Sequence, residues 1–135
     1  MIKIIYGPKG TGKTTKIIDE ANAAAQAAKG LSVFITDNSR CRLSVNHAIR
    51  FIDVTDWAVA GEDALCGFIK GVAACNGDHE YIYIDGLARI AGKPLADLAG
   101  IFYMLDKISN ENNITITITC SGEKNELPDF VKKYV

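Results

Sequence analysis

The sequence predicts an α/β protein built on a mostly parallel sheet of five to six strands, flanked by helices. Short apolar runs alternate along the chain with segments of helical periodicity, and this alternation is typical of βαβ units. No repeat or linker divides the 135 residues, so we expect a single compact domain spanning residues 1–135. The most polar segments follow the predicted strands, at the sheet edge where such proteins bind ligands.

The first half of the chain is expected to form three strands and one helix. Residues 2–6 are a short β-rich run, and residues 13–29 carry apolar and small side chains at helical spacing. Gly30 follows as a helix stop, because glycine readily adopts the left-handed conformation that ends helices. Residues 31–36 (LSVFIT) and 50–54 (RFIDV) are then the second and third strands.

The second half repeats the same alternation of helix and strand. Residues 62–74 form a helix, residues 81–85 (YIYID) a strand, and residues 95–109 a further helix. Residues 114–119 (ITITIT) are the fifth strand. Residues 127–135 fit one helical turn that leads into a very short strand, which would be the sixth.

The composition is that of an ordinary globular protein and argues against several kinds of partner. A net charge of −1 and a pI of about 6.1 leave no overall basic field for nucleic acid or an anionic membrane. No apolar stretch approaches the ~20 residues that span a bilayer, and the first apolar run is too short for a signal peptide. We therefore expect a cytoplasmic protein with neither a membrane nor a nucleic-acid partner.

The cysteines and histidines show no metal-site pattern. They are Cys41, Cys66, Cys75, Cys120, His47 and His79. No two cysteines form a C-x-x-C, and neither histidine has a partner at ligand spacing, so neither zinc nor a disulfide is expected. We predict that Cys66, Cys75 and Cys120 are small buried side chains and that both histidines lie on the surface or in loops.

The segment GPKGTGKT, residues 7–14, carries the strongest chemical signal. It matches G-x-x-x-x-G-K-[ST] between a predicted strand and a predicted helix, which is the context this phosphate-binding loop requires. Glycines let the backbone curl so that several N–H groups meet phosphate oxygens, while the helix N-terminus points at the same anion. Lys13 is expected to reach the outer phosphates. The predicted nucleotide-binding residues are Gly7, Pro8, Lys9, Gly10, Thr11, Gly12, Lys13, Thr14 and Thr15.

A magnesium site is expected where two predicted elements meet this loop. The Thr14 hydroxyl is the usual Mg²⁺ ligand of the motif, and Asp85 ends the strand YIYID, where its carboxylate holds the ion directly or through water. Asp85 is followed by Gly86, Leu87 and Ala88, so there is no D-x-x-G, and no guanine-reading N/T-K-x-D occurs. The sequence therefore favours ATP with Mg²⁺ over GTP.

With this loop and this aspartate, the chain resembles the P-loop NTPases over most of its length, and the loop is similar to that of the AAA+ and RecA-like branch. The resemblance implies a RecA-like P-loop nucleoside triphosphate hydrolase fold, with a further strand between the loop strand and the Asp85 strand. It also implies a polar sensor residue, for which Thr119 and Ser121 are candidates besides being ordinary strand-end residues. The chain is similar, too, to short ATP-binding proteins of Firmicutes, some labelled twitching-motility proteins of the PilT type.

The resemblance bears on hydrolysis. AAA+ proteins usually have Glu directly after the strand aspartate, whereas this chain has Gly86. RecA-like proteins place an acid at the end of the second strand, where this chain has Asp37, although Asp-Asn-Ser is also common turn chemistry. Lys13 and Asp37 are therefore the predicted catalytic residues, with Asp37 orienting the attacking water.

Several basic residues near the predicted strand ends leave the function open. Arg40, Arg42 and Arg89 are candidates to stabilise a transferring phosphate or to hold an anionic second substrate, or they are solvated surface residues. The leading prediction is an ATP-binding protein that acts as a weak Mg²⁺-dependent ATPase or a nucleotide-controlled switch on a protein partner. The alternatives are a small-molecule or nucleotide kinase, with Asp37 and Arg40 gripping the acceptor, and a non-enzymatic scaffold. Self-association is expected, because such ATPases often complete their site with an arginine from a neighbouring subunit.

Overall fold

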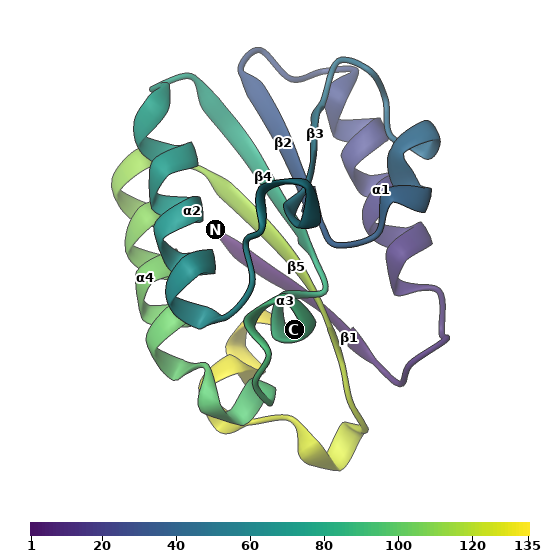
Figure 1. The fold of residues 1–135 in the computed structure, drawn as a ribbon, viewed down its shortest axis with the longest axis vertical. Coiled ribbons are helices and arrows are strands. Elements are labelled where there is room, and N and C mark those ends of the chain that lie inside the picture. Colours follow the sequence, from purple (N-terminus) through teal and green to yellow (C-terminus); the bar gives the residue numbers. More distant parts are fainter.

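The computed structural model, which describes residues 1–135, has one five-stranded sheet with helices on both faces (Figure 1). All strand pairs are parallel, and the strand order is β1-β5-β4-β2-β3. The strands are β1 (Ile2–Gly7), β2 (Leu31–Thr36), β3 (Arg50–Asp53), β4 (His79–Asp85) and β5 (Thr115–Ser121). The predicted α/β class with a parallel sheet is confirmed, with five strands.

Four α-helices and five short 3-10 helices connect the strands. The α-helices are α1 (Lys13–Ala25), α2 (Glu62–Cys75), α3 (Leu87–Ala91) and α4 (Ala99–Asn112). The 3-10 helices are η1 (Ser39–Ser44), η2 (Val54–Trp57), η3 (Leu95–Asp97), η4 (Lys124–Glu126) and η5 (Asp129–Tyr134). None of the helices has the length and apolar character that a membrane crossing needs.

Two hydrophobic clusters cover the two faces of the sheet, because neighbouring residues of a strand point to opposite sides. The larger cluster of 22 buried residues joins the sheet to α2, α3 and α4, and it includes Ile35 of β2 and Ile84 of β4. The smaller cluster of 8 buried residues joins the sheet to α1, and it includes Phe34 of β2 and Tyr83 of β4. Figure 1 shows the resulting layers, with α1 on one side and α2 and α4 on the other.

The strand order brings distant parts of the sequence to one edge of the sheet. β5 lies between β1 and β4, as expected for the strand between the loop strand and the Asp85 strand. In register, Gly7 of β1 pairs with Ser121 of β5, and Asp85 of β4 pairs with both Thr119 of β5 and Thr36 of β2. The carboxyl ends of these four strands therefore meet, and the site is built on them.

Two predicted helices have wrong bounds. α1 ends at Ala25 instead of residue 29, because the chain must turn to reach β2. The backbone N–H groups of Lys29 and Gly30 donate to a carboxylate oxygen of Glu80, at 3.0 and 2.8 Å, which fixes the turn against the start of β4. The helix predicted for residues 95–109 begins with the separate turn η3. α4 then starts at Ala99, and it extends to Asn112.

The C-terminal segment forms no sixth strand. Asp129–Tyr134 is the 3-10 helix η5, and its aromatic side chains pack on α4 instead of pairing with the sheet. The ring of Phe102 lies 5.7 Å from that of Phe130 and 6.1 Å from that of Tyr134, between ring centres. Val131 of the same segment is completely buried in the larger hydrophobic cluster, so η5 is anchored by side-chain packing.

Two further predictions about polar side chains are wrong. His79 was expected on the surface or in a loop, but it opens β4 and is 9% exposed, since the strand begins two residues earlier than its apolar pattern suggests. Cys75 was expected to be buried, but it is exposed at the last position of α2. His47 is exposed, and Cys120 is buried, as predicted.

Candidate functional site

The loop between β1 and α1 has a backbone that favours glycine at two positions. Gly10 and Gly12 have φ values of 82° and 84°, in the left-handed region that glycine adopts without steric cost. Gly12 is also the N-cap of α1, and no side chain caps this helix end. The first turn of α1 contains no acidic residue. No residue of the first turn therefore compensates the positive end of the helix dipole, and an anion is stabilised there.

The side chain of Lys13 lies over this loop. Its Nζ donates a hydrogen bond of 2.8 Å to the carbonyl of Pro8, which also accepts one of 2.7 Å from the Thr11 hydroxyl. Lys13 makes no ion pair with a carboxylate, unlike five other basic residues of the chain. Exchanging a neutral carbonyl for a phosphate oxygen gains a charge-assisted hydrogen bond, so this ammonium is poised to bind an anion.

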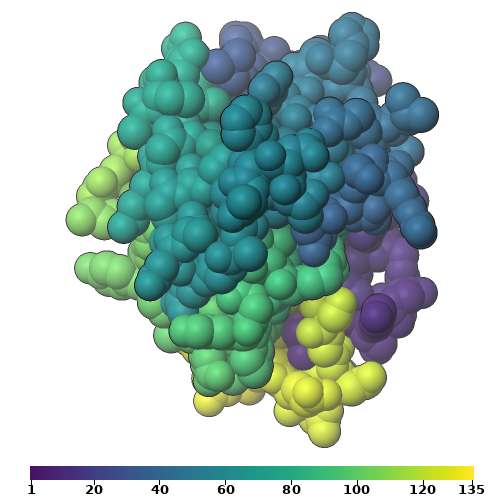
Figure 2. Space-filling model, viewed as in Figure 1, coloured from purple at the N-terminus to yellow at the C-terminus, as the bar shows by residue number.

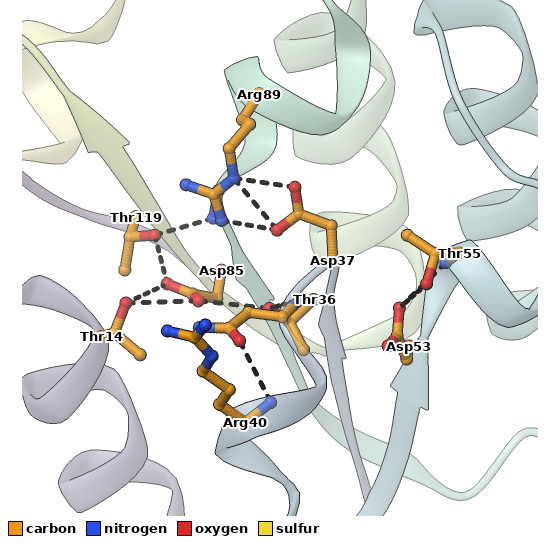
Figure 3. A network of polar contacts seen from close by, with 11 residues as sticks. Thr14, Thr36, Asp37, Arg40, Asp53, Thr55, Asp85, Arg89 and Thr119 are labelled. Atoms are coloured by element: carbon orange, nitrogen blue, oxygen red, sulfur yellow. Dashed lines mark hydrogen bonds and ion pairs between the residues drawn. The ribbon is translucent and has the colours of Figure 1, made fainter.

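Asp85 is the centre of a hydrogen-bond network of threonines (Figure 3). The carboxylate is buried, with the residue 2% exposed, and it accepts hydrogen bonds from the hydroxyls of Thr14, Thr36 and Thr119. The distances are 3.1, 3.2 and 2.8 Å, and the three donors come from α1, β2 and β5. A buried charge is expensive unless it is hydrogen-bonded, and here hydroxyls alone, without any cation, satisfy it.

The pair formed by Thr14 and Asp85 fits a magnesium ion. Both donate hard oxygen atoms, which Mg²⁺ prefers, and the Thr14 Oγ1 lies 3.1 and 3.3 Å from the two carboxylate oxygens. Adjacent ligands of an octahedral Mg²⁺ lie about 3.0 Å apart, because each is about 2.1 Å from the ion. No group of three His, Cys, Asp or Glu side chains could hold a metal alone. Phosphate oxygens and waters would complete the coordination, as is usual for Mg²⁺.

A cavity of about 340 Å³ lies beside this network, between the loop and the ends of β4 and β5. Figure 2 shows the purple N-terminal part of the chain and the yellow C-terminal segment next to each other at the lower right. Its lining contains three cations and one carboxylate, so the cavity is net positive. The lining residues are Lys9, Gly10, Gly12, Lys13, Thr14, Thr15, Asp85, Gly86, Ala88, Arg89, Thr119, Cys120 and Ser121.

Most of the predicted nucleotide and metal residues line this cavity, but some do not. Gly7, Pro8 and Thr11 contribute to the shape of the loop without lining the cavity. Asp37, the predicted water-orienting acid, also lies outside the lining. Its carboxylate is held instead by Arg89, whose Nε lies 2.8 Å from Oδ2 and whose Nη2 lies 2.6 Å from Oδ1.

The Asp37–Arg89 ion pair is bidentate and partly buried. The side chain of Asp37 is 22% exposed and that of Arg89 is 56% exposed. The hydrogen bonds to Asp37 raise the pKa of Arg89 further above its ordinary value, so the guanidinium is charged at every relevant pH. Arg89 therefore places a permanent cation in the cavity wall.

The other candidate arginines differ in their position. Arg42 points away from the cavity, since its guanidinium lies 3.5 Å from Asp56 and 4.6 Å from the ring centre of Phe51. Arg40 is exposed and makes no ion pair. Figure 3 shows its side chain extending toward the side of the network on which Thr14 lies. Arg40 and Arg89, but not Arg42, thus face the candidate site.

The two sensor candidates on β5 differ in their exposure and in their hydrogen bonds. The Thr119 hydroxyl donates a hydrogen bond to Asp85 and accepts one of 2.8 Å from the backbone N–H of Gly86. It is therefore already engaged both as a donor and as an acceptor. Ser121 is exposed, lines the cavity, and makes no such side-chain bond. Between them, Cys120 is buried, and burial raises the pKa of its thiol to about 12. The thiol is therefore a neutral part of the wall.

Sequence reasoning missed two parts of the site. Thr36 was not predicted, although it stands beside Asp37 at the end of an apolar strand and pairs in register with Asp85. The short helix α3 was also missed, since five residues are too few for a periodic signal. Its glycine caps, Gly86 with φ 87° and Gly92 with φ 69°, were the signal that could have indicated it.

Comparisons with known proteins bear on the fold of the chain and not on its function. No protein-family model matches the chain, and no curated protein matches it in sequence. The crystal structure of the flagellar accessory protein FlaH from Methanocaldococcus jannaschii is similar, with a TM-score of 0.60 and 16% sequence identity. The similarity covers 98% of this chain but 65% of FlaH. The fold and the site thus define an α/β protein with a net-positive cavity at the carboxyl edge of a parallel sheet, and the likeness to FlaH is one of fold.

Proposed function

We propose that this chain is a P-loop NTPase of the RecA-like type that binds ATP with Mg²⁺ in the cavity beside Asp85. The observation that carries the proposal is the convergence of three features on one cavity. Three groups meet there: an uncapped helix N-terminus, the ammonium of Lys13, which has no carboxylate partner, and a threonine–aspartate pair at magnesium-ligand spacing. Each of these features suits the phosphates of a nucleotide or their metal ion.

The chain's own residues would divide the work as follows. Backbone N–H groups around Gly10 and Gly12 bind the inner phosphates, and Lys13 leaves the Pro8 carbonyl to bind the outer ones. Thr14 and Asp85 hold Mg²⁺, which neutralises phosphate charge when it is bound. The buried threonine hydroxyls fix the orientation of the Asp85 carboxylate before any ligand arrives.

We infer slow hydrolysis or a nucleotide-controlled switch rather than a fast enzyme. Asp85 is the one acid in the cavity lining, and the carboxylate of Asp37, the predicted water-orienting acid, is neutralised by Arg89. A group that orients or deprotonates water must have a free oxygen near the terminal phosphate. The carboxylate of Asp37 is already paired with Arg89, which supports a low basal rate of ATP hydrolysis that a partner could raise.

The experiment is an ADP-release assay of wild type and Lys13→Ala with ATP and Mg²⁺. Slow ADP release that the variant loses supports an ATPase or switch. Release that depends on an added nucleoside or small-molecule acceptor would favour the kinase. Nucleotide binding without any release would favour the scaffold. Two exposed side chains keep the kinase as the second candidate: Ser121, which lines the cavity, and Arg40, which extends toward the network in Figure 3.

A further inference from the structure

The guanidinium of Arg89 occupies the space that a side chain at position 86 would take. A Cβ built on Gly86 would lie 2.5 Å from the Arg89 Cζ and 3.0 Å from its Nη1, which is closer than side-chain contacts allow. Gly86 also has a φ of 87°, a conformation that favours glycine. The missing side chain after the strand aspartate thus makes room for Arg89 to fold back beside Asp85.

The rest of α3 holds Arg89 in this position. Leu87, Ile90 and Ala91 are buried in the larger hydrophobic cluster, whereas Ala88 and Arg89 line the cavity. Gly86 and Gly92 end the helix on both sides, so α3 is a short and well-anchored support. The backbone of Arg89 is therefore fixed, and only its side chain is free to change partner.

Arg89 uses only part of its hydrogen-bonding capacity on Asp37. A guanidinium has five N–H groups, and the contacts with Asp37 are made by Nε and Nη2. Nη1 has no partner in the protein. Arg89 also lines the cavity, whereas Asp37 does not. The cation thus stands between a protein carboxylate on one side and the proposed phosphate site on the other.

We propose that the Arg89–Asp37 ion pair opens when a nucleoside triphosphate binds, because the guanidinium moves from Asp37 to the terminal phosphate. This inference rests on the proposed nucleotide binding and adds to it the means of distinguishing triphosphate from diphosphate. A diphosphate lacks the outermost phosphate, so it leaves the ion pair closed. The movement is an exchange of one bidentate oxyanion partner for another, which suits the geometry of arginine.

The exchange also has a structural consequence outside the cavity. Asp37 directly follows β2 and precedes η1, and Arg89 belongs to α3, so the ion pair ties the segment after β2 to the segment after β4. No other ion pair joins these two segments. Opening it would remove this tie at the start of η1, while Cys41, buried in the smaller hydrophobic cluster, still holds the rest of the turn.

The test compares the affinities of ADP and of a non-hydrolysable ATP analogue, both with Mg²⁺, by calorimetry. In Arg89→Ala, binding of the ATP analogue is expected to weaken about tenfold, the effect of losing a charge-assisted hydrogen bond, while binding of ADP stays within about twofold. In Asp37→Asn, the ATP analogue should bind about fivefold tighter, because the competing carboxylate is gone. In the double variant, the Asp37 change should have no further effect.

The control is Arg42→Ala, which removes a more exposed Arg–Asp ion pair outside the cavity lining and should change neither affinity. Thermal unfolding of each variant shows whether it is folded; Arg89 is half-exposed, so its removal should leave the fold intact. Equal weakening of both nucleotides in Arg89→Ala, or no tightening in Asp37→Asn, would overturn the exchange and leave nucleotide binding standing. A wild type that binds neither nucleotide would overturn both.

Discussion

Replacing Thr119 with valine tests whether the Asp85 network is as tightly built as its distances indicate. Valine has nearly the shape of threonine but no hydroxyl. The change removes the 2.8 Å hydrogen bond to the Asp85 carboxylate, and it also removes the acceptor of the Gly86 backbone N–H at 2.8 Å. Thr119 is 3% exposed, so water cannot easily replace either bond.

The magnitude follows from the two lost interactions. A hydrogen bond to a charged group contributes about 1.5–3 kcal/mol, and an unsatisfied buried N–H costs about 1–3 kcal/mol. These effects share one atom and are not fully additive, so we expect the free energy of unfolding to fall by about 2–4 kcal/mol. For a chain of 135 residues, the entropy of unfolding converts this to a melting temperature lower by about 7–14 °C.

The assay is thermal and urea unfolding of the ligand-free protein, with two controls on β5. Thr119→Ser keeps the hydroxyl and should lose no more than about 1.5 kcal/mol, the cost of a buried methyl group. Thr117→Val changes an equally buried threonine, 2% exposed, that takes no part in the Asp85 network, and it should be close to neutral. A loss for Thr119→Val no larger than that for Thr117→Val would refute the proposed strength of the network.

Three further predictions concern the loop, the metal and the thiols. Gly12→Ala places a Cβ at a φ of 84° and should cost about 1–2 kcal/mol in urea unfolding, so an unchanged midpoint would contradict the loop geometry. Asp85→Asn keeps the size of the side chain but removes its charge and one of the two oxygens that accept from the threonines. If Asp85 holds the metal, chelating Mg²⁺ should change ATP binding by this variant no more than about twofold in calorimetry, whereas a dependence on Mg²⁺ as large as that of the wild type would exclude Asp85 as a ligand. After treatment with iodoacetamide at mildly alkaline pH, peptide mass spectrometry should find the exposed Cys75 alkylated and Cys120 unmodified until the protein unfolds. Burial raises the pKa of Cys120 to about 12, so its reactive thiolate forms only near that pH. Equal alkylation rates of the two cysteines in the folded protein would contradict the burial of Cys120.

Local patterns were sufficient to predict most of the fold. The five strands follow from apolar runs bounded by turn residues, as in YIYID before Asp85, and the sequence around Gly12 predicted the start of α1 at the correct residue. Local patterns do not predict the order of the strands in the sheet, because that order depends on which crossovers pack best over the whole sheet. The burial of His79 likewise depends on its neighbours in space, and its own segment gives no sign of it.

The residues of the candidate site also fall into two groups, those that a local pattern predicts and those that only the assembled fold places. Lys13, Thr14 and Asp85 were predicted from a motif and a strand end, and they line one cavity. The position of Arg89 depends on the left-handed turn at Gly86, and that turn, one residue long, leaves no periodic trace in the sequence. The pairing of Arg89 with Asp37 spans 52 positions in the chain, so only the assembled sheet reveals it.

The most direct test of the central claim is a calorimetric titration of the wild type with ATP and Mg²⁺, repeated with Lys13→Ala. Lys13 is half-buried at the cavity, and the only hydrogen bond of its side chain is to the Pro8 carbonyl, so the substitution should leave folding unchanged. We expect saturable binding at one site in the wild type and its loss in the variant. Absence of heat and of binding in the wild type, with the protein folded, would contradict the assignment of this cavity to nucleotide phosphates.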